Sequence, residues 1–498
     1  MADPGVPLLL EQEDRSVPVA KSRTRGWTPS AIAADIATLG VGTALAAVFN
    51  TLLVFLIPRL VSVEEYGYWR LFLLYAGYAG FLHFGFADGA LLRWVGKPRE
   101  EIARESGTAI KFVALLQVPL LLVGGILVLA LLHGPLDFCG VGILVFATVL
   151  NLATVLQYST QAARVFKPVA VVTALAPGAF IGMVFLETLR KSLTGPELIL
   201  LYVLSWSLVL AYLWRKVSPR LGRAGISAWR LGKSCILAGW PVVLANTGYG
   251  LVRSADRLVV SSALPITDFA QYSLAASAMF VPVAAIAAVS RVFLSHAALV
   301  EHDDRANIYG HMSRFLLIAW SLLLPYFFVL EAFVKRFLPR YIVALPVAGV
   351  LILSVIFLAG IQILHMNYFY LYGKQKQFLI RTLAALALGL ATALALTEWL
   401  HSLMFVAAGQ VGVLGLWWLL NEWSLRKSSG QHLTDWLRAF AAAILSAGSY
   451  GFALWSAREI GWRLLAYYSM VAVVLWSFCG DELRFSLRLV KAGPRSEG

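Results

Sequence analysis

Long apolar runs dominate this chain and are separated by short polar segments. A run of about 18 or more apolar residues is long enough to cross a bilayer as one α-helix. We count about fourteen such runs. The pattern predicts an all-α polytopic membrane protein. The runs are centred in 31–60, 67–92, 108–132, 141–163, 168–188, 197–214, 235–263, 270–299, 312–334, 344–370, 378–398, 402–420, 438–456 and 461–479.

Basic residues divide unevenly between the two sets of connecting segments. With the N-terminus inside the cell, the inner segments hold roughly three times as many Lys and Arg as the outer ones, which predicts a cytoplasmic (inner) membrane protein with both termini cytoplasmic. This asymmetry accounts for the net charge of +14. A nucleic-acid partner is therefore not needed to explain the charge.

Several kinds of chemistry lack their sequence signals. Residues 232–234 (GKS) resemble the end of a phosphate-binding loop, but Ser227 stands where that motif needs glycine. The three cysteines are far apart and show no metal spacing, so no metal or cofactor is expected. The outer loops are short, whereas a glycan polymerase or ligase usually carries a large catalytic loop. These features favour transport over bond formation.

One membrane segment carries an unusual charge cluster. A charged side chain near the bilayer centre costs roughly 2.5–3.5 kcal/mol, so it usually faces a cavity or a partner. Arg253, Asp256 and Arg257 are spaced three and four residues apart, which predicts one helical face. Asp256 can act as the counter-ion of one arginine, and the remaining positive charge suits a phosphate or carboxylate. The alternative is an internal salt bridge that holds this helix to a neighbour.

Other charged and polar residues fall within apolar segments. Arg70 is expected near the outer membrane interface. Asp88 and Arg291 are candidate cavity residues because the repeat offset described below places them opposite one another. A polar patch of the tenth segment is expected to join helices or to bind a proton, and it contains Gln362, His365 and Asn367.

A short motif recurs in the two halves of the chain. Residues 63–69 (VEEYGYW) open the second apolar segment, and residues 266–272 (ITDFAQY) open a later one, an offset of 266 − 63 = 203 residues. Each motif has an acidic residue expected to cap a helix start, followed by aromatic, small, polar and aromatic positions. Two similar halves around a central site are typical of transporters.

The first motif extends into a longer resemblance. Residues 62–69 (SVEEYGYW), followed by 84–93 (FGFADGALLR), resemble the first hairpin of polysaccharide-transport flippases, in which an acidic pair precedes Tyr-Gly and a Phe-Gly stretch ends near an Arg. That family is the polysaccharide-transport (Wzx-type) branch of the multidrug/oligosaccharidyl-lipid/polysaccharide (MOP) exporter superfamily. The resemblance spans about residues 30–400. Further similar segments lie at 255–257, 269–272, 335–341 and 371–374.

This resemblance implies two pseudo-symmetric six-helix lobes around a central cavity. The chain departs from the commonest twelve-helix pattern by adding two C-terminal helices. Two such helices also occur in the lipid II flippase branch, so the resemblance does not decide which lipid-linked glycan would be the substrate. The expected parts are a cytoplasmic N-terminal tail (1–29), an N-lobe (30–215), a basic cytoplasmic linker (216–234), a C-lobe (235–420), two additional helices with a cytoplasmic connection (421–480) and a cytoplasmic tail (481–498).

The implied activity is that of a flippase rather than an enzyme. It would move a polyprenyl-diphosphate-linked oligosaccharide, such as an O-antigen or exopolysaccharide unit, across the membrane by alternating access. Arg253 and Arg257 would bind the diphosphate. The expected partners are this lipid-linked substrate and the bilayer, with a glycan polymerase or ligase as a further candidate. The alternatives are a small-molecule or ion antiporter of the same superfamily and a scaffold or enzyme of a glycan-assembly complex.

Overall fold

The computed structural model describes residues 29–190, 193–219, 226–279, 282, 305–429, 433–456 and 459–492. Every regular element in these ranges is a helix. The elements are α1 (Pro29–Leu60), α2 (Val63–Ala76), the 3₁₀ helix η1 (Ala79–His83), α3 (Phe86–Trp94), α4 (Arg99–Leu131), α5 (Pro135–Ala162), α6 (Phe166–Thr188), α7 (Gly195–Val217), α8 (Ile226–Arg253), α9 (Ala255–Ala263), α10 (Ile266–Ser277), α12 (Arg305–Leu323), α13 (Tyr326–Phe337), the 3₁₀ helix η2 (Pro339–Tyr341), α14 (Ala344–Leu351), the 3₁₀ helix η3 (Ile352–Ser354), α15 (Val355–Ala359), the π-helix η4 (Gly360–His365), α16 (Met366–Leu371), α17 (Gln375–Leu400), α18 (Leu403–Ser429), α19 (Leu433–Ser456) and α20 (Ile460–Ala492).

Twelve helical spans of the described residues are long and apolar enough to cross a membrane. Two further predicted segments are also helical where they are described. One is broken into α2, η1 and α3, and the other begins with α10 and continues into residues outside the description. The prediction of an all-α polytopic membrane protein is confirmed.

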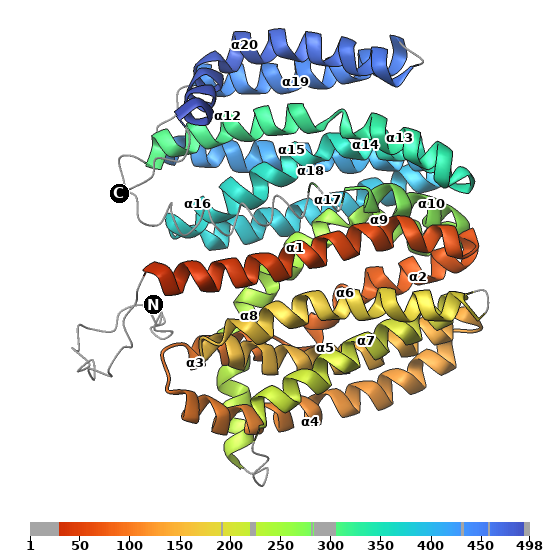
Figure 1. The fold of residues 1–498 in the computed structure, drawn as a ribbon, viewed down its shortest axis with the longest axis vertical. Helices are drawn as coiled ribbons and strands as arrows, with labels where there is room; N and C mark the ends of the chain where they lie inside the picture. Colours follow the sequence, from red (N-terminus) through yellow and green to blue (C-terminus); the bar gives the residue numbers. More distant parts are fainter. Residues whose placement is uncertain are drawn as a thin grey trace, which may run out of the picture.

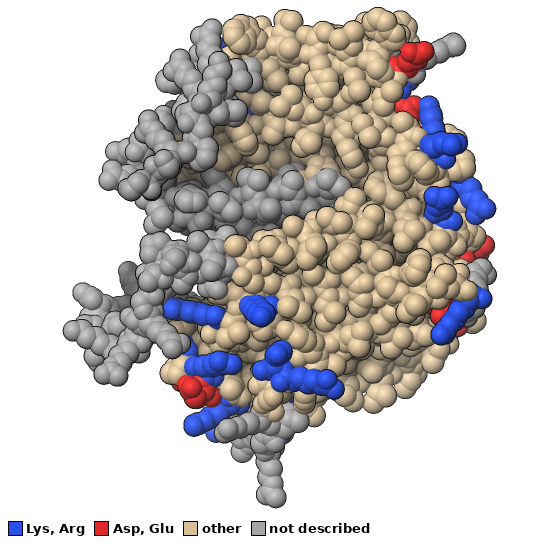
Figure 2. Space-filling model, in the orientation of Figure 1, with Lys and Arg blue, Asp and Glu red and all other residues tan. Residues whose placement is uncertain are grey.

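The surface is apolar where a bilayer would surround it. Charged side chains lie mainly at two opposite edges of the molecule, with a broad uncharged belt between them (Figure 2). On α4, Leu122 and Ile126 are 61% and 68% exposed. Leucine and isoleucine at this exposure are unfavourable in water and suited to contact with lipid chains. The protein is therefore a multi-pass membrane protein.

The helices form two groups that follow the chain order (Figure 1). In the N-terminal group α1 packs on α6, and α5 packs on both α4 and α7. In the C-terminal group α17 packs on α18, α14 on α10 and α18, and α12 on the α19–α20 pair. The long helix α8 joins the groups, because it packs on α3 and α4 as well as on α17.

The start of α8 lies within the segment predicted to be a linker. The helix begins at Ile226, and the basic residues that suggested a loop, Arg230 and Lys233, lie exposed on its surface. Buried residues on the other face include Leu231 and Cys235. These basic residues lower the hydropathy of the first turns of α8, which explains why hydropathy placed the start of this segment too late.

Three glycines bring α3 and α8 into backbone contact. A Cβ atom on Gly89 would lie 1.9 Å from the carbonyl oxygen of Cys235, and one on Gly239 would lie 1.9 Å from the carbonyl oxygen of Gly85. Gly85 also has a φ of 79°, which favours glycine. The first part of α8 is thus held closely against the N-terminal group.

The two repeated motifs lie side by side. They form the starts of α2 and α10, which pack on one another, and a Cβ on Gly67 would lie 2.6 Å from the carbonyl oxygen of Ile266. The halves therefore meet at the segments that resemble each other.

The prediction that an acidic residue caps these helices was wrong. The N-cap of α2 is Ser62, whose hydroxyl accepts a hydrogen bond from the backbone N–H of Glu65 at 3.1 Å, and the residue before α10 is Pro265. Glu65 and Asp268 instead lie in the first turns of their helices. There a carboxylate interacts favourably with the helix macrodipole without being the cap.

Candidate functional site

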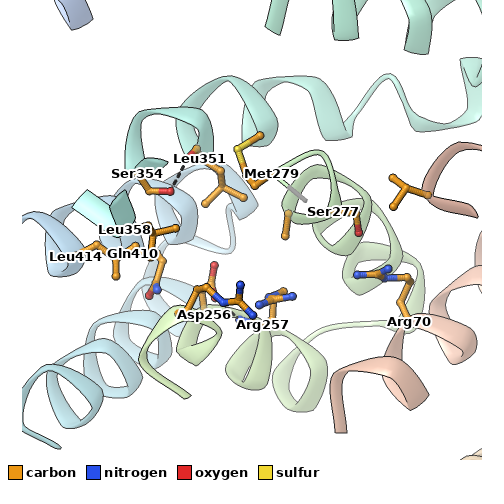
Figure 3. A pocket seen from close by; sticks show the side chains of 13 residues that line it. Arg70, Asp256, Arg257, Ser277, Met279, Leu351, Ser354, Leu358, Gln410 and Leu414 are labelled. Carbon is orange, nitrogen blue, oxygen red and sulfur yellow. Dashed lines mark hydrogen bonds between the residues drawn. The ribbon is translucent and has the colours of Figure 1, made fainter. Parts of the chain in front are cut away.

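A cavity of about 170 Å³ lies where the two halves of the protein meet (Figure 3). The lining residues come from α1, α2, α8, α9, α10, α14, η3, α15 and α18 and from Met279 after α10. The wall combines cationic, polar and apolar side chains, and therefore suits a ligand that carries charge. The lining residues are Val54, Arg70, Arg253, Asp256, Arg257, Ala276, Ser277, Met279, Leu351, Ser354, Leu358, Gln410 and Leu414.

Three arginines converge on this cavity. Arg70 comes from α2, Arg253 is the last residue of α8, and Arg257 lies in the first turn of α9. Ser254 interrupts the helix between the last two with φ −126° and ψ 17°. The sequence predicted one continuous helical face, whereas the structure brings these residues together from two helix segments.

The arginines lack partners at some of their buried atoms. Within the described residues, the Nε atoms of Arg70 and Arg253 are buried and have no hydrogen-bond partner. Arg257 repels both of these arginines electrostatically. Half-buried charges that repel one another, with buried donor atoms left without hydrogen bonds, are costly, and a bound anion would reduce that cost.

The position of Arg70 differs from the expected interfacial one. Its side chain lines the cavity and points toward the side that holds Arg257 (Figure 3). Hydropathy placed it near the end of a membrane segment. That segment is broken after α2, and α2 packs on α10 in the interior, which directs Arg70 to the centre.

Asp256 is bound mainly by groups other than the arginine side chains. It is 2% exposed, and its Oδ2 atom accepts a hydrogen bond from the Tyr272 hydroxyl at 2.5 Å. Its Oδ1 atom accepts one from the backbone N–H of Arg257 at 2.8 Å. The carboxylate is held in place by these bonds, and the cavity keeps an excess of positive charge.

Asp88 lies away from the arginine cavity. It is in the first turn of α3, and its Oδ2 atom is 3.8 Å from Nε2 of His83. Nδ1 of His83 accepts a hydrogen bond from the backbone N–H of Gly85 at 3.1 Å. Arg291, the predicted partner of Asp88, lies outside the described residues.

The three residues of the predicted polar patch face different neighbours. Gln362 accepts a hydrogen bond from the Tyr249 hydroxyl of α8 at 3.2 Å. Asn367 donates to the carbonyl of Ile363 within its own segment at 2.7 Å. His365 is fully buried, and its Nε2 atom lies 2.8 Å from Oε2 of Glu422 on α18. The patch is thus divided among several contacts.

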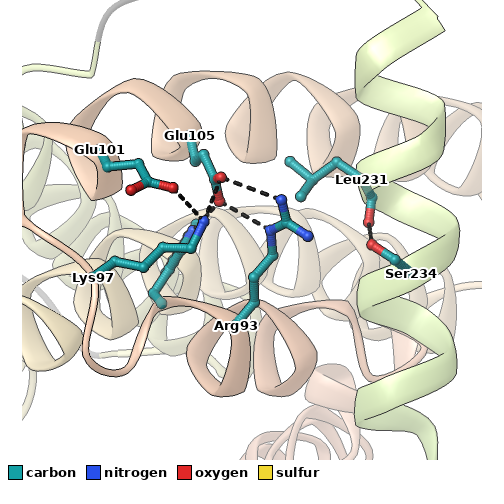
Figure 4. A network of polar contacts seen from close by, with 7 residues as sticks. Arg93, Lys97, Glu101, Glu105, Leu231 and Ser234 are labelled. Carbon is teal, nitrogen blue, oxygen red and sulfur yellow. Dashed lines mark hydrogen bonds and ion pairs between the residues drawn. The ribbon is translucent and has the colours of Figure 1, made fainter. Parts of the chain in front are cut away.

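A second charged network lies at one end of the N-terminal group (Figure 4). Arg93 donates to Glu105 at 3.1 Å, and Lys97 donates to Glu101 at 2.6 Å and to Glu105 at 2.8 Å. The bonds to Glu101 and then Glu105 raise the pKa of the Lys97 amine. Since these charges neutralise one another, the network joins α3 to α4 and has no charge left for a ligand.

Neither comparison by sequence found a relative. No protein-family model matches the chain, and no curated protein matches it. Solved structures do match its fold, including the following two. A structure of the lipid II flippase MurJ in an inward-closed conformation has a TM-score of 0.68 at 13% identity, covering 90% of this chain and 99% of the other. An inward-facing multidrug resistance MATE family transporter of the MOP superfamily has a TM-score of 0.58 at 12% identity, covering 80% and 99%.

The chain has the fold of the MOP-superfamily transporters. At these identities the similarity establishes the fold alone. The resemblance noted in the sequence is therefore supported for the superfamily fold, and the polysaccharide-transport branch stays a prediction.

Within this MOP fold, sequence reasoning missed several residues that contact the predicted ones. Tyr272 binds Asp256, and Glu422 binds His365. Tyr272 ends the repeated motif, so the motif contained the signal. Glu422 was assigned to a polar connection, whereas α18 continues to Ser429 and buries Glu422 to 2% exposure.

Proposed function

We propose that this protein is a transporter that moves a polyprenyl-diphosphate-linked oligosaccharide between the leaflets of the cytoplasmic membrane, with both termini in the cytoplasm. One observation carries the proposal: Arg70, Arg253 and Arg257 line a single cavity at the junction of the two halves. A diphosphate supplies several anionic oxygens, and guanidinium groups bind such oxygens through paired, charge-assisted hydrogen bonds.

The origin of the arginines supports alternating access. Arg70 belongs to the N-terminal group, whereas Arg257 is on α9, which packs on α17 of the C-terminal group. A diphosphate would be held from both sides when the groups are close. A movement of one group against the other would separate the arginines and weaken binding, as release requires.

The volume of the cavity limits how much of the proposed substrate it can hold. Its volume of about 170 Å³ is below the roughly 300–1,000 Å³ of a cavity for a drug-sized ligand. It suits a diphosphate rather than a whole lipid-linked glycan. The proposed cycle therefore requires the two groups to move apart before the sugar enters.

The charge of the cavity argues against the main alternative. A transporter that expels cationic small molecules would need an excess of carboxylates at its binding site. Here Asp256 is the acidic residue of the lining, opposite three arginines. A glycan polymerase or ligase as a partner remains part of the proposal, as the machinery that would consume the translocated unit.

The proposal is tested by leaflet transfer in proteoliposomes. A fluorescent polyprenyl-diphosphate-linked saccharide is followed with wild type, Arg253→Ala and Arg257→Ala, each checked for insertion and monodispersity. We expect transfer by wild type and its loss in both variants. The matched control is Arg381→Ala, because the Arg381 guanidinium lies 5.4 Å from the centre of the Phe369 ring and does not line the cavity. Equal transfer by wild type and both cavity variants would reject the arginine site.

A further inference from the structure

A second cluster of titratable residues lies apart from the arginine cavity, in the C-terminal half. It consists of Glu422 on α18, His365 at the end of η4 and Tyr309 on α12. The histidine and the tyrosine are 0% exposed, and the glutamate is 2% exposed. Oε2 of Glu422 accepts a hydrogen bond from the Tyr309 hydroxyl at 2.7 Å and lies 2.8 Å from Nε2 of His365.

These contacts fit one arrangement of protons, which the proposal below assumes. In it, an ionised Glu422 accepts hydrogen bonds from the Tyr309 hydroxyl and from an Nε2–H of His365. Nδ1 of His365 is buried and has no hydrogen-bond partner in the described part of the chain. A proton added at Nδ1 changes the charge of the His365–Glu422 pair from −1 to 0, and loss of that proton restores −1.

The pair formed by His83 and Asp88 differs from the His365–Glu422 pair in whether Nδ1 of the histidine already has a hydrogen-bond partner. In His83, Nδ1 already accepts a hydrogen bond from the backbone of Gly85, and Nε2 is 3.8 Å from Asp88. Protonation of His83 at Nδ1 would break an existing hydrogen bond. Protonation of His365 breaks none and pairs the new charge with a carboxylate at 2.8 Å.

The local backbone is also unusual. Residues Gly360–His365 form a π-helical turn between α15 and α16. A Cβ atom on Gly360 would lie 2.3 Å from Nε1 of Trp418, so this turn packs closely on α18. Such π-turns are rare in proteins, and those that occur are often found at functional sites.

Other charged and titratable groups lie on the elements packed here. Arg314 on α12 and Arg426, one helical turn after Glu422 on α18, carry permanent positive charges. The further groups are His311 on α12, Tyr368 on α16, and Tyr372 and Lys374 between α16 and α17.

The same structural elements reach the arginine cavity. Gln410 and Leu414 of α18 line it, as does Leu358 of α15, which is followed directly by η4. A change in the bond between His365 and Glu422 would alter how η4 is held against α18. It would thereby shift two walls of the cavity.

We propose that His365 and its carboxylate neighbour Glu422 form a proton-binding site whose loading drives the change between the two arrangements of the halves. This inference rests on the proposed transport function and names its coupling ion. The proton comes from water on one side of the membrane, binds Nδ1 of His365, and leaves to water on the other side.

The binding step is tested without any transported substrate. The full chain is labelled with ¹³C at histidine Cε1 and titrated by NMR in lipid nanodiscs. Its 8 histidines make assignment practical, because the His365 signal is the one missing in His365→Gln. We expect that signal to move as the pH is lowered, and to respond differently in Glu422→Gln, because the amide takes away the carboxylate that contacts the ring. A His365 signal that stays constant over the whole pH range in which the protein remains folded would overturn the proposal.

The coupling step is tested in proteoliposomes with the fluorescent lipid-linked saccharide. An imposed pH gradient should change the wild-type transfer rate, by at most about tenfold per pH unit for one proton. His365→Gln should transfer at a rate that does not respond to the gradient. Tyr309→Phe is the structural control, because it removes one hydrogen bond to Glu422 and keeps the titrating ring; it should keep the response.

The possible results separate the two proposals. A titrating His365 with a gradient response that His365→Gln loses and Tyr309→Phe keeps supports the proton site. Equal gradient responses in wild type and His365→Gln overturn it, while leaving the flippase proposal intact. Loss of the response in all variants alike, Tyr309→Phe included, indicates a purely structural cluster and also overturns it. No transfer by wild type at any gradient overturns the proposed function, and with it the coupling role.

Discussion

Two cavities of similar volume lie within the described residues; their linings share no residue, and only one lining is charged. The arginine cavity measures about 170 Å³ and the other about 180 Å³. The second lies between α12, α15, α18 and α19, and apart from Ser313 and the indole rings of Trp320 and Trp418 its lining is aliphatic or phenyl. Since their sizes are nearly equal, volume does not distinguish a candidate anion site here. The charge of the lining residues does.

One helix contributes to both cavities. Gln410 and Leu414 of α18 face the arginine cavity, and Val411 and Trp418 face the apolar one. Neighbouring positions of one helix thus lie on different faces. Substitutions on the two faces of α18 and its neighbours should therefore have separable effects on anion binding and on stability.

The largest effect is expected from Arg257→Ala. Truncation of one member of a buried charged contact typically costs 2–5 kcal/mol, so affinity for a soluble probe such as farnesyl diphosphate should fall about 30-fold or more. Isothermal titration calorimetry on the purified protein measures this. An unchanged Kd would mean that the arginine cavity is not the site that binds the diphosphate.

A smaller loss is expected from Arg70→Lys. Lysine keeps the positive charge but lacks the planar fork that binds two phosphate oxygens at once. The same calorimetric titration should show affinity for farnesyl diphosphate reduced by about five- to tenfold. If lysine binds as well as arginine, the site recognises charge only.

Asp256→Asn is expected to raise affinity by about three- to tenfold. The change removes a negative charge from the cavity, while an amide can still accept the backbone N–H of Arg257. The gain should shrink as salt is added, because screening weakens the electrostatic contribution. A loss of affinity would instead mean that Asp256 orients the arginines, as the spacing of the three residues suggested.

The smallest effect on binding is expected in the apolar cavity. Ala443→Phe adds apolar volume there, at a position that does not line the arginine cavity. Affinity for farnesyl diphosphate should stay within about twofold of wild type. The free energy of unfolding should change by about 1–3 kcal/mol, according to how the added ring packs. A large loss of affinity would show that the two cavities act as one site.

Much of the fold could be predicted because membrane helices are local. The length of an apolar run is enough to identify a span, and the repeated motif at residues 63 and 266 pointed to two related halves. The interruptions were harder to predict. The break at Ser254 and the π-turn ending at His365 depend on how each helix packs, and hydropathy averages over such local changes.

The candidate site likewise has a part that the sequence could predict and a part that it could not. The spacing of Arg253 and Arg257 was visible in one segment, because an uncompensated charge in an apolar run is conspicuous wherever its partners lie. The approach of Arg70 from α2 and the contact of His365 with Glu422 were not visible. Each joins side chains from different helices. Hydrophobic length and period specify which segments enter the membrane, but the packing of whole helices decides which of their polar side chains meet.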